Sequence, residues 1–251
     1  MVFQPPKTNQ VAAIQKFLFE KYKFSDSISV ASDIERILNG EPLDYVIGWV
    51  PFLGAAIDLS LKPFIPRPET EYWASEAIKD IKKRKGKAIR ILDVFSGSGC
   101  IGVAILESVP EVHVTFAEKN PRFIEQIKIN LKKNNCPENR FQVFRSDVFQ
   151  AIKGQFDVIV ANPPYVGMFS RLDKEVKKYE PKIAYHGGKN GLSAISRFLK
   201  SAKLYLEPEG QIWMEFGSWQ QSEIRKILTR FGYRDFSFHK DQYGRPRYVI
   251  V

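Results

Sequence analysis

Hydrophobic and polar positions change their pattern at about residue 88. From there on, short apolar runs typical of buried strands alternate with segments of helical period. We expect strands over 88–94, 112–117, 141–145, 156–161, 211–216, 234–239 and 247–251, and helices over 99–108, 121–133, 192–206 and 220–231. This alternation is typical of an α/β fold, in which a parallel sheet is covered by helices on both faces.

Two features modify that picture near the end of the chain. The turn-like segment 241–244 joins the last two predicted strands into a hairpin, so one strand should run antiparallel in an otherwise parallel, seven-stranded sheet. The stretch 162–188 has no clear period, and we expect it to be irregular.

The first 66 residues follow other patterns. Residues 8–38 carry apolar positions at helical spacing, and Asn39-Gly40 is a typical helix end. Apolar residues then alternate with Pro and Gly over 41–65, which predicts a β-hairpin, and a helix begins near Thr70, its expected cap. We therefore divide the chain into a small helical domain (1–39), a β-hairpin connector (40–66) and a main α/β domain (67–251).

Composition narrows the classes of function. Lysine and arginine total 38 against 28 acidic residues, and the net charge of +10 favours an acidic or RNA-containing partner. Cys100 and Cys136 lack CxxC spacing and the three histidines are scattered, so we predict neither a disulfide nor a metal site. No apolar run approaches the roughly 20 residues of a membrane helix, and no signal peptide is evident, so we expect a cytoplasmic protein.

A glycine-rich turn follows the first strand of the sheet. Phe95-Ser96-Gly97-Ser98-Gly99 leads into a helix, where the backbone can approach a ligand closely and free N–H groups attract negative charge. Gly97, Gly99 and Gly102 also satisfy GxGxxG, which is a weak signal by itself.

Acidic residues follow the next two strands. Glu118 stands 21 residues after Gly97, where a carboxylate can accept hydrogen bonds from both hydroxyls of a ribose. Asp147 either meets an adenine amino group, with Val148 against the ring, or caps a helix. Because parallel strands end at the same edge of the sheet, these positions together predict a nucleoside-containing ligand.

The fourth strand ends in Asn162-Pro163-Pro164-Tyr165. Two consecutive prolines constrain the backbone and remove two N–H donors, so the carbonyl oxygens of the turn are left as acceptors. Asn162 adds a side-chain oxygen, and Tyr165 offers an aromatic face to a planar group. The oxygen atoms of the turn can therefore accept hydrogen bonds from both hydrogens of one NH2 group.

This arrangement distinguishes a methyltransferase from a nicotinamide-dependent oxidoreductase, which shares the layout but gives the turn no role. An amide or aromatic amine nitrogen is a poor nucleophile because its lone pair is delocalised. Two acceptors on its hydrogens return electron density to nitrogen, while position and electrostatics supply most of the catalysis. No strong base is needed, since the proton leaves after nitrogen has gained positive charge. We predict methyl transfer from S-adenosylmethionine, with S-adenosylhomocysteine as product.

At these residues the chain resembles the HemK/PrmC methyltransferases. The resemblance covers nearly everything after residue 39: Gly40-Glu41-Pro42 with Tyr45 and Gly48, Ile65 to Glu71, the glycine turn, Asn162 to Tyr165, Tyr179-Glu180-Pro181, Gly187-Gly188, Gly191-Leu192, Glu215-Phe216-Gly217, and Asp241 with Gly244 and Arg245. Residues 66–69 and 179–181 separate this family from nucleic-acid amino methyltransferases, which share only the tetrapeptide.

The resemblance implies methylation of the glutamine side-chain amide in the Gly-Gly-Gln motif of class 1 peptide chain release factors. It implies a class I, Rossmann-like fold with a reversed last strand, preceded by a helical domain that helps to dock the release factor. It also implies cofactor contacts at residues 95–99, Glu118, Val148 and Asn162, and catalytic and substrate contacts at Asn162, Pro163, Pro164 and Tyr165.

Departures from the family pattern are few. Phe95 stands where many members have glycine, Glu118 where aspartate is usual, and Asn190 where aspartate often follows the paired glycines. None of these changes removes a required group. Only 39 residues precede Gly40, fewer than a full helical domain, so the docking of a partner is not predicted in detail.

Other functions fit parts of the sequence. Glutamine methylation of a ribosomal protein would use the same tetrapeptide, and amino methylation of adenine or cytosine would suit the positive charge. Against methylation of nucleic acid, the sequence contains no added recognition domain and no basic, aromatic-rich insertion. A non-enzymatic binding module would leave every catalytic group without a role. We expect a monomer that needs no nucleic acid.

Overall fold

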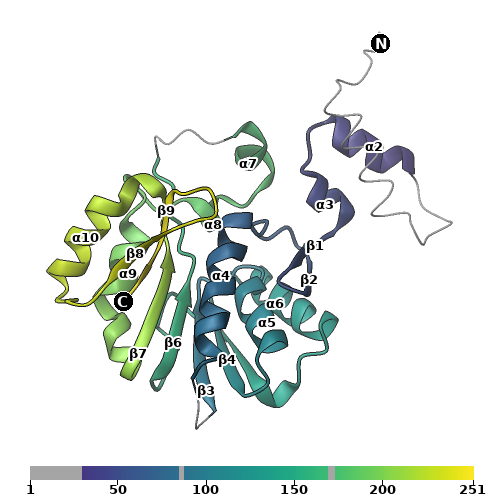
Figure 1. Cartoon of the computed structure of the whole chain (residues 1–251). Coiled ribbons are helices and arrows are strands. Elements are labelled where there is room, and N and C mark those ends of the chain that lie inside the picture. Colours follow the sequence, from purple (N-terminus) through teal and green to yellow (C-terminus); the bar gives the residue numbers. More distant parts are fainter. Residues whose placement is uncertain (1–29, 85–87, 169–172) are drawn as a thin grey trace.

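Seven strands form one sheet in the order β5-β4-β3-β6-β7-β9-β8, as the computed structural model shows (Figure 1). Their bounds are Ile89–Val94 (β3), Val112–Glu118 (β4), Phe141–Arg145 (β5), Phe156–Ala161 (β6), Leu206–Glu215 (β7), Ser237–Lys240 (β8) and Pro246–Ile250 (β9). The structure describes residues 30–84, 88–168 and 173–251. β9 is antiparallel to both of its neighbours, whereas β3 to β7 pair in parallel, which confirms the predicted fold class.

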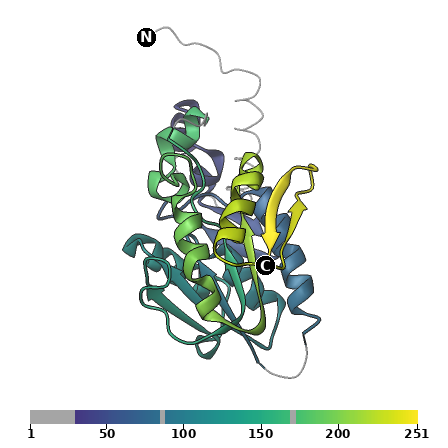
Figure 2. The same ribbon diagram turned by 90° about the vertical axis from the view of Figure 1, so that its left-hand side faces the viewer.

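Helices cover both faces of this sheet (Figures 1 and 2). One face packs against α4 (Pro68–Ile81), α5 (Cys100–Ser108) and α6 (Pro121–Lys133), and the other against α9 (Ser193–Ser201) and α10 (Gln221–Arg230). In β6, Val158 and Val160 belong to the first core and Ile159 and Ala161 to the second. Because successive side chains point to opposite faces, a strand covered on both sides is apolar at most positions, and in β6 the exception is Asp157.

The stretch expected to be irregular contains two short helices, α7 (Lys174–Tyr179) and α8 (Lys182–Tyr185). Pro181 separates them, and each is too short for its period to be recognised in the sequence. β7 begins five residues earlier than predicted, because Pro208 and Gly210 lie in an irregular part of the strand where its register with β6 shifts. The described residues also form 3-10 turns at Glu138–Arg140 (η1), Ala202–Tyr205 (η2) and Ser218–Gln220 (η3).

The N-terminal elements differ from the prediction in one helix. α2 (Val30–Leu38) is followed by Asn39-Gly40, as expected, and Gly40 has a φ of +81°. The predicted helical positions 8–29 lie outside the described residues. The hairpin is β1 (Trp49–Phe52) and β2 (Ala55–Asp58). The predicted strand pattern before it was wrong, because 43–47 form the helix α3 (Leu43–Ile47), which buries the adjacent residues Tyr45 and Val46.

Amide side chains of α6 and of Asn134, the residue that caps its C-terminal end, hold the hairpin against the α/β domain. Asn134 and Asn130 accept hydrogen bonds from the backbone N–H groups of Ala56 and Asp58 at 2.8 and 2.7 Å. Asn130 also donates through Nδ2 to the carbonyl oxygen of Ser98 at 2.9 Å. The hairpin is thereby coupled, through one helix, to the glycine-rich turn. Among the described residues, no helix has the length and apolarity required to cross a membrane.

Candidate active site

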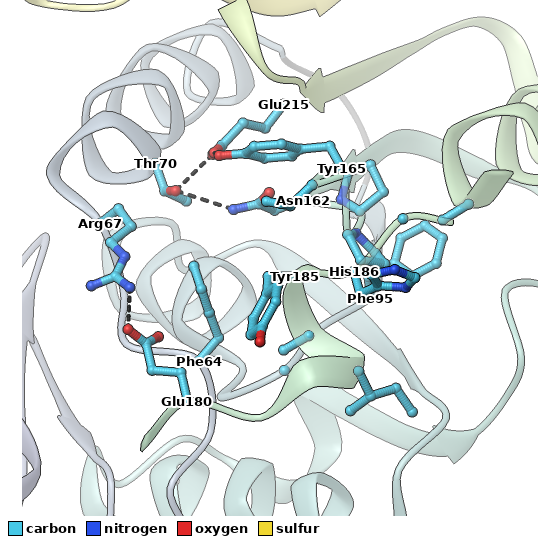
Figure 3. Close-up of a pocket in the computed structure, with 18 of the residues that line it drawn as sticks. Phe64, Arg67, Thr70, Phe95, Asn162, Tyr165, Glu180, Tyr185, His186 and Glu215 are labelled. Atoms are coloured by element: carbon cyan, nitrogen blue, oxygen red, sulfur yellow. Dashed lines mark hydrogen bonds and ion pairs between the residues drawn. The ribbon is translucent and has the colours of Figure 1, made fainter. Parts of the chain in front are cut away.

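A cavity of about 950 Å³ opens where β3 and β6 end. The chain leaves β3 toward β4 on one side and later returns to β6 on the other, and such a switch of strand order is where open α/β sheets bind ligands. Predicted site residues that line it are Phe95, Ser96, Gly97, Ser98, Glu118, Asp147, Val148, Asn162, Pro163, Pro164 and Tyr165 (Figure 3). The cavity has room for a cofactor and for one substrate side chain.

Left-handed backbone shapes the glycine-rich turn. Phe95, Gly97 and Gly99 have φ values of +60°, +56° and +79°. Gly99 does not line the cavity, and a Cβ there would lie 3.1 Å from the side chain of Ile127 on α6. A positive φ explains why many family members have glycine in place of Phe95. The Phe95 ring packs edge-on against Phe198 of α9, with centroids 6.1 Å apart.

Glu118 ends β4 and holds this turn in place. Its carboxylate accepts hydrogen bonds from the N–H groups of Gly97 at 2.9 Å and Asn120 at 2.7 Å. The side chain is buried, and burial raises its pKa. A carboxylate can accept about four hydrogen bonds, so capacity for two ribose hydroxyls remains. Glu118 and the turn therefore fit the nucleoside part of S-adenosylmethionine.

Asp147 and Val148 follow β5. Asp147 pairs with Lys119 at 2.8 Å and with Arg197, and it caps no helix among the described residues, so that alternative was wrong. Burial raises the pKa of Asp147, but the hydrogen bonds from Arg197 and Lys119 outweigh it and lower the pKa overall. Val148 is buried, with a φ of +58°. The pair lies on the cavity wall, on the Glu118 side of the sheet edge.

The Asn162-to-Tyr165 turn lies beside the glycine-rich turn, because Ala161 pairs with Val94. Within the part of the chain that the structure describes, Asn162 Oδ1 and the Pro163 carbonyl oxygen accept no hydrogen bond. The Tyr165 hydroxyl donates to Glu215 at 3.1 Å, so this residue presents its ring to the cavity. Burial raises the pKa of Tyr165, which therefore stays protonated. The turn offers acceptors and a planar surface, as predicted from its sequence.

A second loop, residues 187–191, packs against the backbone of the Asn162-to-Tyr165 turn. A Cβ at Gly187 would lie 2.3 Å from the carbonyl oxygen of Pro164, and one at Gly191 would lie 2.1 Å from that of Tyr165. The Gly187 N–H donates to the Val166 carbonyl at 2.9 Å. Only glycine permits so close an approach, which gives Gly187 and Gly191 of the family pattern a physical reason.

Among the residues that line the cavity, Arg67 and Glu180 had no individual role predicted from the sequence, and Thr70 had a different one. The buried Glu180 pairs with Arg67 and accepts a hydrogen bond from the Ile65 N–H at 3.2 Å (Figure 3). Thr70 is not the expected helix cap, because Arg67 occupies that position and Pro68 begins α4. Thr70 is instead buried and donates to Glu215 at 2.6 Å. These residues lie in shared segments of the family pattern, which was the only signal pointing to them.

Comparison with known proteins agrees with this geometry. Residues 76–176 match the family model "Methyltransferase small domain". The chain is 34% identical over 226 residues to "Release factor glutamine methyltransferase" from Thermodesulfovibrio yellowstonii, covering 89% of this chain and 80% of that one. It is 32% identical to the protein of the same name from Agrobacterium fabrum, covering 88% and 78%.

Solved structures agree in fold alone. The hMettl16 catalytic domain in complex with MAT2A 3'UTR hairpin 6 superposes with a TM-score of 0.62 at 15% identity, covering 98% of this chain and 92% of that one. Membership of a family is shown by the sequence relatives, because their alignments cover most of both chains. They confirm the resemblance. The chain therefore belongs to the release factor glutamine methyltransferase family and is an S-adenosylmethionine-dependent methyltransferase.

Proposed function

We propose that the protein methylates the side-chain amide nitrogen of the glutamine in the Gly-Gly-Gln motif of class 1 peptide chain release factors. The observation that carries this proposal is the pair of acceptors, Asn162 Oδ1 and the Pro163 carbonyl, on the wall of a cavity beside the glycine-rich turn. The names of the sequence relatives support the choice of a release factor glutamine over an adenine or cytosine.

The cofactor residues in this proposal are Phe95, Ser96, Gly97, Ser98, Glu118, Asp147, Val148 and Asn162, whereas the predicted residue Gly99 shapes the turn without lining the cavity. Bound S-adenosylmethionine supplies a methyl group on a positively charged sulfur. Glu118 binds the ribose hydroxyls through the lone pairs that Gly97 and Asn120 leave free. Asp147 accepts from the adenine amino group, and its lowered pKa keeps it ionised at neutral pH.

Asn162, Pro163, Pro164 and Tyr165 bind the glutamine amide and provide the catalysis. The Asn162 Oδ1 and Pro163 carbonyl accept one hydrogen each from the NH2 group, and the Tyr165 ring supports its plane. Both acceptors gain strength as nitrogen becomes positive, so they stabilise the transition state more than the bound substrate. Such a site needs no base of high pKa, since the product nitrogen releases its proton readily.

Incubation with radiolabelled S-adenosylmethionine and a purified release factor tests the substrate. We expect label on the wild-type release factor and none on a variant whose Gly-Gly-Gln glutamine is alanine. Label that persists in that variant, or that appears only on a ribosomal protein or on nucleic acid, would refute the assignment. In this proposal the enzyme acts in the cytoplasm, as a monomer and without nucleic acid.

A further inference from the structure

A buried hydrogen-bonded chain runs behind Asn162 (Figure 3). Asn162 donates through Nδ2 to Thr70 Oγ1 at 3.1 Å, and Thr70 Oγ1 donates to Glu215 Oε2 at 2.6 Å. The same carboxylate oxygen accepts from the Trp73 indole N–H at 2.7 Å. Thr70, Trp73 and Glu215 are each at most 2% exposed. These hydrogen bonds link α4 and the end of β7 to the turn after β6.

The order of donors and acceptors in this chain follows from the chemistry of its members. An indole N–H can only donate, so Glu215 Oε2 must accept from Trp73. The Thr70 hydroxyl has one hydrogen, and it is directed to the same oxygen. Only lone pairs of Thr70 therefore remain to face Asn162, whose carboxamide must turn its NH2 group toward Thr70.

A carboxamide has two orientations related by a half-turn about its last bond. In the opposite orientation Oδ1 would face the lone pairs of Thr70, and the NH2 group would face the ligand. Two acceptors opposed in a buried site lose a hydrogen bond and repel each other. The observed orientation leaves Oδ1 as the atom that a ligand can meet.

Glu215 is itself held by neighbours on its other side. The Tyr165 hydroxyl donates to Oε1 at 3.1 Å. Burial raises the pKa of Glu215, and the hydrogen bonds from its neighbours and the charge of the buried Arg247 oppose this rise. One carboxylate therefore orients two residues of the turn: Tyr165 directly and Asn162 through Thr70. A polar group buried this deeply is stable only when its partners are all in place.

We infer that Thr70 is a positioning residue that selects the orientation of the Asn162 carboxamide, with Trp73 and Glu215 setting the direction of the Thr70 hydroxyl. This inference rests on the proposed function, because it assumes that Oδ1 receives the NH2 group of the substrate. It assigns a role to α4, which carries no residue predicted to touch the reacting atoms.

Thr70→Val removes the hydroxyl while keeping the shape of the side chain. We expect kcat for release factor methylation to fall about tenfold to a hundredfold, because a misdirected contact at the reacting group costs that much. The dissociation constant of the cofactor should change by less than about threefold, and Thr70→Ser should recover most of kcat. Thr115→Val, at a half-buried position in β4, is the matched control and should leave kcat unchanged.

A double-mutant cycle distinguishes positioning from general loss of structure. If Thr70 acts through Asn162, then Thr70→Val added to Asn162→Ala should lower kcat by no more than about twofold further. Losses that multiply in the double variant would overturn the inference, as would a kcat for Thr70→Val equal to that of the wild type.

An NMR measurement decides the question without any substrate. In protein labelled with ¹⁵N on asparagine, the side-chain signal of Asn162 is identified by its absence in Asn162→Ala. One of its two amide hydrogens should exchange slowly in the wild type and in Thr70→Ser, and rapidly in Thr70→Val. Equal exchange in all three would refute the hydrogen-bonded chain. A wild type that fails to methylate the release factor refutes the proposed function but leaves this test valid.

Discussion

Asp93 is a buried carboxyl group at the next-to-last position of β3, just before the glycine-rich turn. Its Oδ2 accepts from the Gly102 N–H at 3.0 Å, while Oδ1 is buried and has no hydrogen-bond partner among the described residues. Burial raises the pKa of Asp93 to about 8. The side chain therefore holds its proton at neutral pH, unlike the paired Asp147 on the same sheet edge.

This raised pKa predicts a pH dependence of stability. Between about pH 4 and pH 8 the folded protein keeps a proton on Asp93 that the unfolded chain releases. The free energy of unfolding should therefore fall as pH rises through this window. In Asp93→Asn the fall should be smaller, as measured by urea unfolding at several pH values. The exposed control Asp235→Asn should behave like the wild type, and identical slopes for all three proteins would contradict the assignment.

Glu118 should act on cofactor affinity more than on turnover. Glu118→Gln removes the charge and replaces one acceptor oxygen with a donor, so it weakens both the tether to Gly97 and the contacts with the ribose. We expect the dissociation constant for S-adenosylmethionine to rise about tenfold or more, which is the effect of one lost hydrogen bond to a charged group. Glu111→Gln, at an exposed position just before β4, should leave the affinity measured by calorimetry unchanged.

At the scale of elements, strands and long helices were predictable and short or bulged ones were not. The boundaries of α6, β5 and β6 agree with the sequence pattern, because each is long enough to show its period or its apolar run. α3, α7 and α8 span at most six residues, which is below the length at which a period becomes visible. The candidate site followed from motifs at strand ends, whereas Thr70 and Glu180 act through contacts distant in sequence.

The loop of residues 187–191 offers a direct test of packing between elements. Gly191→Ala would place a Cβ 2.1 Å from the Tyr165 carbonyl oxygen, so the Asn162-to-Tyr165 turn must shift. We expect kcat to fall about a hundredfold while cofactor affinity is retained. Gly154→Ala is the matched control: its φ of +83° resembles the +74° of Gly191, but its nearest contact is 3.9 Å away. Equal losses in both variants would attribute the effect to backbone strain alone.

At the scale of the whole molecule, positive charge gathers near the mouth of the cavity. The net charge is +10, and the segment that includes α7 and α8 carries exposed lysines at 174, 177, 178, 182 and 189 against two exposed carboxylates, Asp173 and Glu175. Asp173, Val176 and Ile183 of the same segment line the cavity, so this basic surface borders the route of a substrate loop. An excess of one charge sign steers a partner of the opposite sign over long distances.

This charge predicts how the reaction responds to salt. Raising ionic strength from about 0.05 M to about 0.3 M shortens the range over which exposed charges attract. The kcat/KM for a release factor should fall severalfold, mainly through KM, while kcat at saturation changes little. A KM independent of salt would show that steering by the basic surface is absent. The KM for the cofactor, measured in the same buffers, serves as the reference.

The most direct test of the central claim locates the transferred methyl group by peptide mass spectrometry of a treated release factor. The wild-type enzyme should add one methyl group to the Gly-Gly-Gln glutamine, on its side-chain nitrogen. Asn162→Ala should bind S-adenosylmethionine within about tenfold of the wild type yet lose about a hundredfold or more in rate, because it lacks one transition-state acceptor. A methyl group on any other residue, or an Asn162→Ala enzyme as fast as the wild type, would contradict the account.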